Sequence, residues 1–408
     1  MIEVEEHLAA VVALATPVPA EEIPISAAGG RVLAEDLVAR LAVPPFDNSA
    51  MDGFAVRAAD LSLMSPEPVE GIELEVVGDI PAGAAELPPV GPGQAVRIMT
   101  GAPLPAGADA VVPVEATDQP LGDVPLPATV RVIEPVSAGR HIRRAGEDVA
   151  PGDPVLSAGQ VMTPAAVSAA ISVGHGSVLV RRRPRVAVLS TGTELVAPGT
   201  SPGIGQIPDS NSALLAGLAE RFGAEVVLAR AVSDEPDEFR RALVEAGGAD
   251  AVVTSGGVSV GAFEVVRQVT EGQVDFVTVA MQPGKPQGRG MVRVGDGRQV
   301  PMLALPGNPV SVFVSAWVFL RPLVARLAGT DAPWRSLRVA VAQGWRTPPG
   351  RRQYAPVVFE SGAVRSTHRL GSGSHLVASL PAAQGLAVVP AEVDEVAAGD
   401  ELEVFLID

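Results

Sequence analysis

Apolar and polar positions alternate with different periods along the chain, and the period changes near residues 44, 142 and 185. At the start, the segments VEEHLAAVVAL and GGRVLAEDLVARL place apolar residues three and four apart, which predicts two helices. From Pro44-Pro45 to about residue 141, short valine-rich runs broken by glycine and proline predict a small β domain. Residues 142–180 mix turns and short strands with one helical segment, MTPAAVSAAISVG.

After the run Arg181-Arg182-Arg183-Pro184, which we interpret as a solvated linker, buried strands alternate with helices. The predicted strands are RVAVLS, EVVLARAV, ADAVVTSGG, FVTVAMQPG and VPMLALPGNP. The predicted helices are SNSALLAGLAERFG, capped by Asp209, Ser210 or Asn211, DEPDEFRRALVEAG, capped by Ser233 or Asp234, and the apolar VSVFVSAWVFLRPLVARLAG. This alternation predicts a doubly wound parallel sheet. After Pro333 valine-rich strands return and predict a further small β domain.

The composition is that of a soluble globular protein, since 47% of the residues are hydrophobic and 43 glycines and 38 prolines are spread along 408 positions. A soft rule of ~150 residues per domain predicts two to four domains. The absence of cysteine excludes disulfides and zinc-thiolate sites, and it fits a cytoplasmic protein. The N-terminal segment is acidic and no apolar run approaches the ~20 residues that span a bilayer, so we expect neither export nor a membrane location.

The formal net charge is -17, which argues against general nucleic-acid binding, because affinity for a duplex rests largely on basic residues that neutralise phosphates. An anionic substrate would need local cations or a metal ion. One cation stands out: Lys285 in QPGKPQG is the only lysine of the chain, and the other 29 of its 30 lysine and arginine residues are arginines. An ammonium is a compact point charge, whereas a guanidinium is a planar fork. Chance survival in a surface turn is the alternative interpretation.

Four unusual loops follow the predicted strands of the α/β region: STGTEL (190–195), TSGGVSVG (254–261), MQPGKPQG (281–288) and LPGNPVS (305–311). Ligands of open parallel sheets bind outside the carboxyl ends of the strands. Glycines and hydroxyls suit an anion, because backbone N–H groups can approach phosphate oxygens. Each loop alone is more simply a tight turn, but four at one end of a sheet predict a binding site. The chain's three asparagines, Asn48, Asn211 and Asn308, all lie in segments singled out for other reasons.

A further polar segment, PPFDNSAMDGFAVRAAD (44–60), opens the first β region. Its residues Asp47, Asn48, Ser49 and Asp52 lie close together in the sequence. A hairpin turn at Asp52-Gly53 is the alternative interpretation. Together with RIMTGAP and RRAGEDV, the segment offers carboxylates and a hydroxyl, the hard oxygen ligands that favour Mg²⁺.

These motifs resemble those of the MoeA family, the molybdopterin molybdenumtransferases, to which the E domain of gephyrin is similar. DNSAMDGFAV, RIMTGAP, RRAGEDV, STGTEL, IPDSNS, TSGGVSVG, MQPGKPQG and LPGNPVS occur in the family's order and cover nearly the whole chain. DNSAMDGFAV and RIMTGAP are highly specific. TSGGVSVG and LPGNPVS are shared with related pterin-binding α/β domains and are less so.

The resemblance implies an elongated homodimer of four-domain subunits. Residues 1–43 with 142–180 would form an elongated mixed domain, 44–141 the small β domain, 181–330 a MogA-like molybdopterin-binding α/β domain, and 331–408 a C-terminal β-barrel. It implies an enzyme that takes adenylylated molybdopterin, cleaves its pyrophosphate link with Mg²⁺, inserts molybdate into the dithiolene and releases AMP. The molybdopterin adenylyltransferase is then a candidate partner, and each site would draw its DNSAMDGF loop from the other subunit.

Site residues follow from the matching positions. Those implied to bear on catalysis are Asp52, Thr100, Asp148, Glu194, Asp234 and Lys285. Those implied to bind the pterin and the oxyanion are Ser190, Thr191, Gly192, Ser255, Gly256, Gly257, Ser259, Gly261, Pro286, Pro306, Gly307, Asn308, Pro309, Ser311, Arg351 and Ser374. Glu194, Asp234 and Glu264 are the candidate Mg²⁺ ligands. Molybdate is a compact tetrahedral dianion, which a single ammonium on Lys285 can contact without bidentate geometry.

The chain departs from the family pattern at three places. Gln282 and Thr278 stand where many members have lysine, and Ala262-Phe263-Glu264 replaces the common Asp-Tyr-Asp. These changes remove positive charge from the oxyanion side and alter a carboxylate on the metal side. Two other functions stay open: a pterin-binding paralogue or scaffold that transfers metal poorly, and a nucleotide pyrophosphatase, against which the DNSAMDGF and RIMTGAP motifs weigh.

Overall fold

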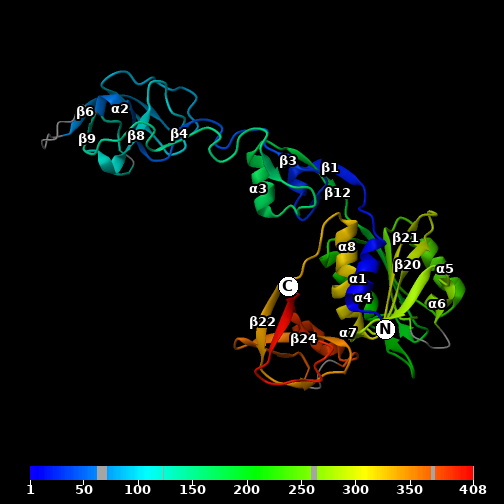
Figure 1. Ribbon diagram of the computed structural model, residues 1–408. Coiled ribbons are helices and arrows are strands. Elements are labelled where there is room, and N and C mark those ends of the chain that lie inside the picture. Colours follow the sequence, from blue (N-terminus) through cyan, green and yellow to red (C-terminus); the bar gives the residue numbers. More distant parts are fainter. Residues whose placement is uncertain (62–70, 123, 259–263, 369–372, 408) are drawn as a thin grey trace.

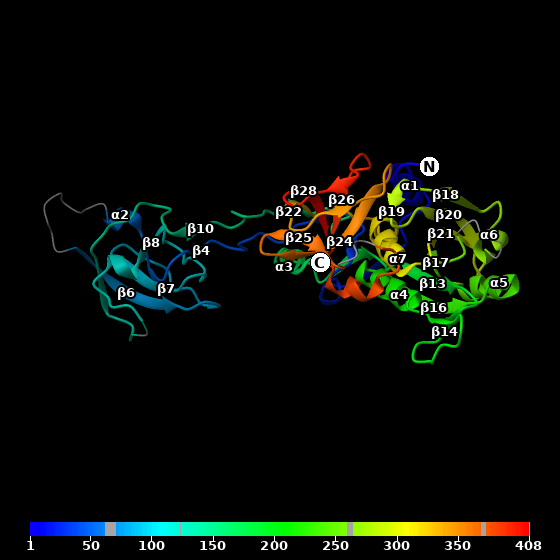
Figure 2. The same cartoon turned by 90° about the horizontal axis from the view of Figure 1, so that it is seen from below.

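The computed structural model describes residues 1–61, 71–122, 124–258, 264–368 and 373–407. The molecule is elongated: a small β unit lies at one end and is joined by two extended segments to a larger body that holds the α/β sheet and the C-terminal strands (Figure 1). The view from below shows the same separation (Figure 2). Residues near 50 and 100 therefore lie far from the α/β sheet of their own chain.

The distal β unit is a five-stranded sheet with the order β8-β5-β7-β6-β9. Its strands are β5 (Gly53–Val56), β6 (Ile72–Ile80), β7 (Gln94–Ile98), β8 (Ala110–Pro113) and β9 (Thr129–Val132). Gly53 is a strand residue and not part of a hairpin turn, so the turn interpretation of Asp52-Gly53 is wrong. A Cβ at Gly53 would lie 2.0 Å from the carbonyl oxygen of Val112, so the close approach of β8 requires glycine here.

The mixed region contains β1 (Ala20–Pro24), β2 (Val32–Leu33), β3 (Leu37–Val38), β11 (Pro154–Leu156), α3 (Pro164–Ser172) and β12 (Ser177–Arg181). The paired strands β4 (Asn48–Ser49) and β10 (Ile142–Arg143) lie with the distal β unit (Figure 2). The helix expected in GGRVLAEDLVARL does not form. Gly30 has a φ of 74°, which favours a turn, and Leu33 pairs with Val180 of β12. Leu37 pairs with Leu156 in the same way. These tertiary pairings override the helical spacing of the apolar residues.

The expected helix at the N-terminus does form, as α1 (Val4–Ala13). Its buried residues Val4 and Val11 share a hydrophobic cluster with Val186 of the α/β sheet. The helix lies beside α8 (Arg321–Leu327), as Figure 1 shows. The start of the chain therefore packs against the α/β body.

The α/β sheet has the order β16-β13-β17-β21-β20-β18. Its strands are β13 (Arg185–Thr191), β16 (Glu225–Val232), β17 (Ala251–Ser255), β18 (Val274–Thr278), β20 (Pro286–Arg293) and β21 (Gln299–Leu305). Strands β13, β16, β17 and β21 are parallel, but β20 is antiparallel to both β21 and β18. The expectation of an all-parallel sheet is thus wrong for β20. This strand was not predicted, because its first residues belong to QPGKPQG, whose glycines and prolines are typical of a turn. The amino end of β20 still lies at the edge where the parallel strands end.

The expected strand FVTVAMQPG is divided between two sheets. Residues Val274–Thr278 form β18, whereas β19 (Met281–Gln282) pairs with β24 (Arg352–Glu360) of the C-terminal region. The segment that leads to Lys285 therefore runs along the junction between the α/β sheet and the C-terminal strands.

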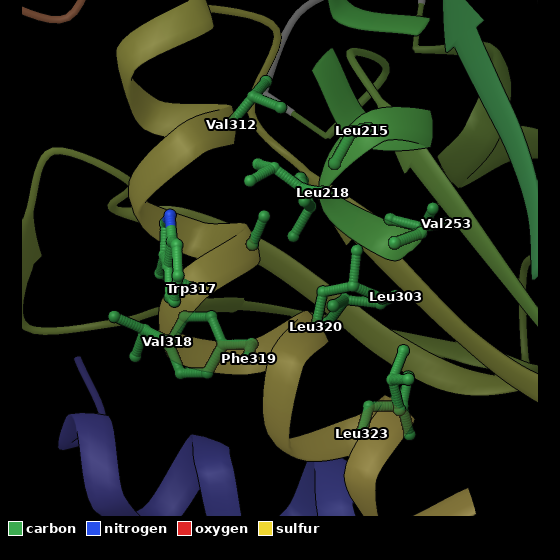
Figure 3. Close-up of a cluster of buried hydrophobic side chains, with 14 of the residues drawn as sticks. Leu215, Leu218, Val253, Leu303, Val312, Trp317, Val318, Phe319, Leu320 and Leu323 are labelled. Atoms are coloured by element: carbon green, nitrogen blue, oxygen red, sulfur yellow. The ribbon is translucent and has the colours of Figure 1, made fainter. Parts of the chain in front are cut away.

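The helices of this region are α4 (Asn211–Arg221), α5 (Pro236–Glu245), α6 (Val265–Val269), α7 (Pro309–Ser315) and α8. A π-helical turn, η3 (Ala316–Leu320), joins α7 to α8. Pro322, which has no backbone N–H to donate, lies in the first turn of α8. Figure 3 shows Trp317, Phe319 and Leu320 of this long helix in one cluster with Leu215 and Leu218 of α4. Their packing makes the helix the centre of the core. The ring of Phe319 meets His7 of α1 edge-on, with 4.7 Å between the ring centroids.

This continuous helix, Pro309–Leu327, is long and apolar enough by composition to cross a membrane, contrary to the expectation that no run approaches that length. However, 83% of its apolar window is buried inside the protein. Burial by neighbouring elements explains the apolar composition as that of a core helix.

The C-terminal strands close into a barrel. β24 pairs with both β25 (Ala363–Ser366) and β26 (Gly385–Val389), and β28 (Glu401–Leu406) links β26 to β22 (Ser336–Val341). Inward-facing residues such as Val357, Val364 and Val404 fill the interior. Closure leaves few free strand edges in this small unit.

Candidate active site

A cavity of about 550 Å³ opens at the carboxyl edge of the α/β sheet. The loops after β13, β17 and β21 and the turn before β20 form its walls, which is the placement expected from the four loops. Sixteen of the residues named from the sequence line it: Thr191, Gly192, Glu194, Asp234, Ser255, Gly256, Gly257, Glu264, Lys285, Pro286, Pro306, Gly307, Asn308, Pro309, Ser311 and Ser374.

Beneath this cavity lies a chain of buried hydroxyls. Ser190 does not line the cavity, but its Oγ lies 3.0 Å from the Oγ of Ser255 and 2.9 Å from the Oγ of Ser212. The Ser212 hydroxyl also contacts a carboxylate oxygen of Asp209 at 2.5 Å. All four side chains are buried, so this chain holds the first and third strand ends in a fixed relation.

Two asparagine side chains tie the cavity walls together. Asn211 Nδ2 donates to the backbone oxygen of Gly307 at 2.7 Å, which links the start of α4 to the LPGNPVS loop. Asn308 Nδ2 donates to Ser374 Oγ at 3.0 Å, which links that loop to the C-terminal region. Ser374 reaches the cavity through this contact, although it lies far away in the sequence.

Lys285 is exposed and lines the cavity. In the described part of the chain its ammonium makes no ion pair and no side-chain hydrogen bond. Its backbone is fixed, because Lys285 O accepts from Val279 N at 2.8 Å. The preceding Gly284 has a φ of 104°, and its carbonyl oxygen accepts from Gln287 Nε2 at 2.7 Å. A rigid turn thus presents an ammonium without a partner to the cavity.

Arg351 does not line the cavity, but it contacts a residue that does. Its Nη1 donates to Gln282 Oε1 at 3.1 Å. Gln282 lines the cavity at one of the positions where the chain departs from the family pattern. The guanidinium therefore contacts the cavity wall through the Gln282 amide.

Asp234 is not a helix cap. Its Oδ2 accepts hydrogen bonds from Thr193 N at 2.9 Å and from Thr193 Oγ1 at 3.0 Å, while helix α5 begins after Glu235 without a side-chain cap. Ser233 does not cap it either, since its hydroxyl contacts Glu238. Asp234 instead holds the STGTEL loop against the end of β16.

Glu194 is packed on the same loop. A Cβ built on Gly192 would lie 2.6 Å from Glu194 Oε2, so glycine leaves room for the carboxylate at this position. Glu194, Asp234 and Glu264 all line the cavity and offer oxygen donors. No group of three or more His, Cys, Asp or Glu that could hold a metal occurs among the described residues. The set still fits Mg²⁺, which needs only one or two carboxylates when substrate phosphates complete its shell.

The distal residues form a separate arrangement. Asp52 Oδ1 accepts hydrogen bonds from Thr100 N at 2.6 Å and from Thr100 Oγ1 at 2.8 Å. These bonds lower the pKa of Asp52, the backbone bond most strongly. Asp148 is exposed, and its backbone N–H donates to Val43 O at 3.0 Å. The structure brings Asp52 to Thr100 but places neither residue at the cavity (Figure 1).

Two expected anion-binding residues, Ser259 and Gly261, lie outside the described residues, as do Ala262 and Phe263. The site residues expected from the sequence omitted several residues of the cavity wall: Leu195, Ile207, Pro208, Asp209, Ser210, Asn211 and Gly284. Gln282, which was named as a departure from the family pattern, also lines the wall. Asp209, Ser210 and Asn211 belong to IPDSNS, one of the motifs that carry the family resemblance, but the role expected for these three residues was helix capping. The cap interpretation is confirmed for Asp209, whose Oδ1 accepts from the backbone N–H of Asn211 and Ser212 at 3.1 Å each. The sequence signal that could have placed these residues in the wall is Asp209, a helix-capping carboxylate at the predicted carboxyl edge of the sheet.

Leu195 and Ile207 come from the paired strands β14 (Leu195–Val196) and β15 (Ile207–Pro208). Figure 2 shows this segment projecting from the edge of the sheet. It adds apolar side chains to a cavity wall that Pro286, Pro306 and Pro309 also line.

Three family models match consecutive parts of the chain: the MoeA N-terminal region (domain I and II) at residues 2–174, the probable molybdopterin binding domain at 187–326, and the MoeA C-terminal region (domain IV) at 338–407. The chain is 43% identical to molybdopterin molybdenumtransferase 2 of Mycobacterium tuberculosis over 99% of both chains. It is 36% identical to the molybdopterin molybdenumtransferase of Synechococcus elongatus over 95% of this chain and 94% of that one.

Among solved structures, the molybdopterin biosynthesis MoeA protein from Pyrococcus horikoshii OT3 superposes with a TM-score of 0.84 at 28% identity and covers 100% of both chains. The sequence matches and the solved fold thus agree over the whole length. The chain belongs to the MoeA family of molybdopterin molybdenumtransferases.

Proposed function

We propose that this chain inserts molybdate into adenylylated molybdopterin and releases AMP, in a reaction that requires Mg²⁺. The observation that carries the proposal is the cavity at the sheet edge, which combines glycine-rich loops, four carboxylates and the only lysine of the chain. The names of full-length relatives support the same chemistry.

Lys285 is the proposed contact for molybdate. A compact dianion can be contacted by the single point charge of an ammonium and does not require the bidentate geometry of a guanidinium. The turn around Gly284 fixes the backbone of Lys285, so contact between the ammonium and the dianion does not require the loop to become ordered. Ser311 and Ser374 add hydroxyl donors on the same wall.

Glu194 and Asp234 are the proposed holders of Mg²⁺, with Glu264 as a third oxygen donor. When bound there, Mg²⁺ supplies charge neutralisation and polarisation of the pyrophosphate bridge. The hydrogen bonds from Thr193 orient the Asp234 carboxylate toward the loop that also carries Glu194. The chain's own contribution is thus to hold two carboxylates at the mouth of the anion-binding loops.

The distal residues Asp52, Thr100 and Asp148 are proposed to complete the site of a second subunit. Their separation from the cavity within one chain supports this proposal (Figure 1). A two-fold homodimer would contain two such composite sites, with donor and acceptor roles exchanged.

One observation favours a second candidate function. Gln282 occupies the cavity wall and is neutral, where many family members carry lysine. A chain with less positive charge at the oxyanion could bind the pterin and transfer metal poorly, as a paralogue or scaffold would.

The two functions are separated by adding molybdate and Mg²⁺ to protein loaded with adenylylated molybdopterin. Stoichiometric AMP release together with metal incorporation into the pterin is the outcome expected for a transferase. Retention of the intact adenylylated pterin at saturating molybdate would favour the scaffold.

A further inference from the structure

A second cavity, of about 320 Å³, shares no lining residue with the candidate active site. It lies where the mixed region, the linker after β12 and the helices α4 and α8 meet. Its 18 lining residues include six arginines: Arg31, Arg181, Arg182, Arg183, Arg221 and Arg321. Among the described residues, Asp331 is the one carboxylate in its wall. The local charge is therefore reversed in a chain whose net charge is -17.

Two of the guanidinium groups have carboxylate partners. Arg31 pairs with Glu21, and Arg182 pairs with Asp250 through Nη1 and Nη2 at 2.6 Å each. The hydrogen bonds to Asp250 raise the pKa of Arg182. Both arginines are neutralised, and Arg182 ties the segment after β12 to the α/β sheet through the buried Asp250. The expectation that this arginine run is a solvated linker is therefore wrong for Arg182.

Three other guanidinium groups have no carboxylate partner in the described part of the chain. Arg181 Nη1 donates to Val18 O at 3.2 Å, and Arg221 Nη2 donates to Ile407 O at 3.2 Å. The Arg221 guanidinium also lies 5.4 Å from the ring centroid of Trp317. Arg183 is exposed and makes no side-chain hydrogen bond there. Carbonyl oxygens and an aromatic ring satisfy donors but leave the positive charges uncompensated.

This arrangement is preorganised for an anion. Arg181 and Arg221 each use one of five N–H groups on a backbone oxygen, so their positions are fixed while most of their donors stay available. Guanidinium groups match the oxygen edges of phosphate and similar oxyanions. Several like charges around one cavity attract a counter-ion strongly, since the surrounding protein screens them less than water does.

We propose that this cavity is a binding site for a tetrahedral dianionic oxyanion, either free or as the phosphate group of a small ester. The volume of about 320 Å³ is near the lower end of small-molecule pockets, about 300–1,000 Å³, so it suits a compact ligand. A bound anion would join the linker arginines to α4, and thus the mixed region to the α/β body.

The test uses the full-length protein at low, constant ionic strength, with chloride replacing the ligand in the reference samples. Inorganic phosphate, AMP and molybdate are titrated separately, by calorimetry and by tryptophan fluorescence, since Trp317 lines the cavity. At least one of the three is expected to bind and to raise Tm. Because molybdate and AMP are also proposed ligands of the candidate active site, the source of the oxyanion is named by the ligand whose binding is weakened by substitution of Arg183 or Arg221.

Arg183→Gln and Arg221→Gln are expected to weaken this binding by about tenfold or more each, since each removes a charged hydrogen-bond donor. Arg241→Gln is the control. Arg241 is exposed on α5, makes no side-chain hydrogen bond or ion pair among the described residues, and its substitution is expected to leave the affinity at that of the parent protein. Anion binding at the candidate active site, which none of these three arginines lines, is expected to be unchanged in all three variants. Equal affinity in the three variants, or no binding of any anion at millimolar concentration, would overturn the proposal.

Discussion

Arg351 Nη1 donates a hydrogen bond of 3.1 Å to Gln282 Oε1, which joins the C-terminal region to the wall of the candidate active site. Gln282 also belongs to β19, which pairs with β24 of the barrel. This wall of the cavity is therefore built jointly by the α/β sheet and the C-terminal strands, and a neutral amide stands between the guanidinium and the cavity.

Gln282→Lys is expected to lower the KM for molybdate by several-fold, because it adds a second ammonium beside Lys285. Some of the gain is offset by repulsion from Arg351, which loses its acceptor. Steady-state AMP release at varied molybdate measures the effect. Gln268→Lys, at an exposed position of α6, is the matched control. An unchanged KM in the Gln282 variant would mean that this wall does not face the oxyanion.

Lys285→Ala is expected to abolish molybdate-dependent insertion while binding of the pterin persists. Lys285→Arg is expected to restore little, because a planar fork does not reproduce a compact ammonium at the end of this rigid turn. Pterin binding and metal incorporation are measured separately for each variant. Near wild-type turnover of Lys285→Arg would show that the geometry of the cation is unimportant.

Removal of divalent metal by excess chelator is expected to stop AMP release, and added Mg²⁺ should restore it, because the cavity is lined by carboxylates that cannot by themselves neutralise a pyrophosphate. Asp234→Asn should raise the Mg²⁺ concentration needed for half-maximal rate. Asp237→Asn, exposed in the first turn of α5, serves as its control. Full activity in chelator would contradict the metal requirement.

A mixture of Asp52→Asn and Lys285→Ala chains is expected to regain activity if sites are shared between subunits. With random exchange about half of the dimers are mixed, and each mixed dimer has one intact site, so activity should approach roughly a quarter of wild type. Subunit exchange is verified with two affinity tags before the assay. Persistent inactivity of the mixed dimers would assign Asp52 a role within its own subunit.

Stability is expected to fall as the pH drops below about 6.5, with His7 as one cause. Burial, and then the neighbouring charge of Arg289, lower the pKa of His7 from 6.5 to about 3. Between these values the unfolded chain binds a proton that the folded chain does not, so acidification favours unfolding. His7 Nδ1 accepts from Arg289 Nη1 at 2.6 Å, which is possible with a neutral ring.

His7→Leu should therefore flatten the dependence of the unfolding free energy on pH between about 6.5 and 3, even though it lowers the stability at neutral pH by leaving Arg289 without its acceptor. Denaturant unfolding at several pH values measures this slope. His375→Leu, at an exposed position, is the control. Identical slopes for His7→Leu and the parent protein would show that another group dominates.

By itself, the sequence determined the order of the regions, most of the strands and helices, and the family. Valine-rich alternation is local, so strands such as β13, β16 and β22 could be recognised from a few residues. The four loops could be assigned to one cavity because the carboxyl ends of parallel strands share one edge of a sheet. The isolated lysine in the chain could be singled out by counting alone.

Tertiary structure decided what depends on partners distant in sequence. Leu33 and Leu37 have helical spacing, yet they form strands because Val180 and Leu156 offer backbone hydrogen bonds and burial together. Asp234 is followed by a helix, yet it accepts from Thr193, a residue 41 positions away, instead of capping that helix.

The arginines around the second cavity come from separate parts of the chain, and only folding places them together. Local periodicity records which face of an element is apolar, but it does not record which element will cover that face or satisfy its polar groups. That choice belongs to the packing of the whole chain.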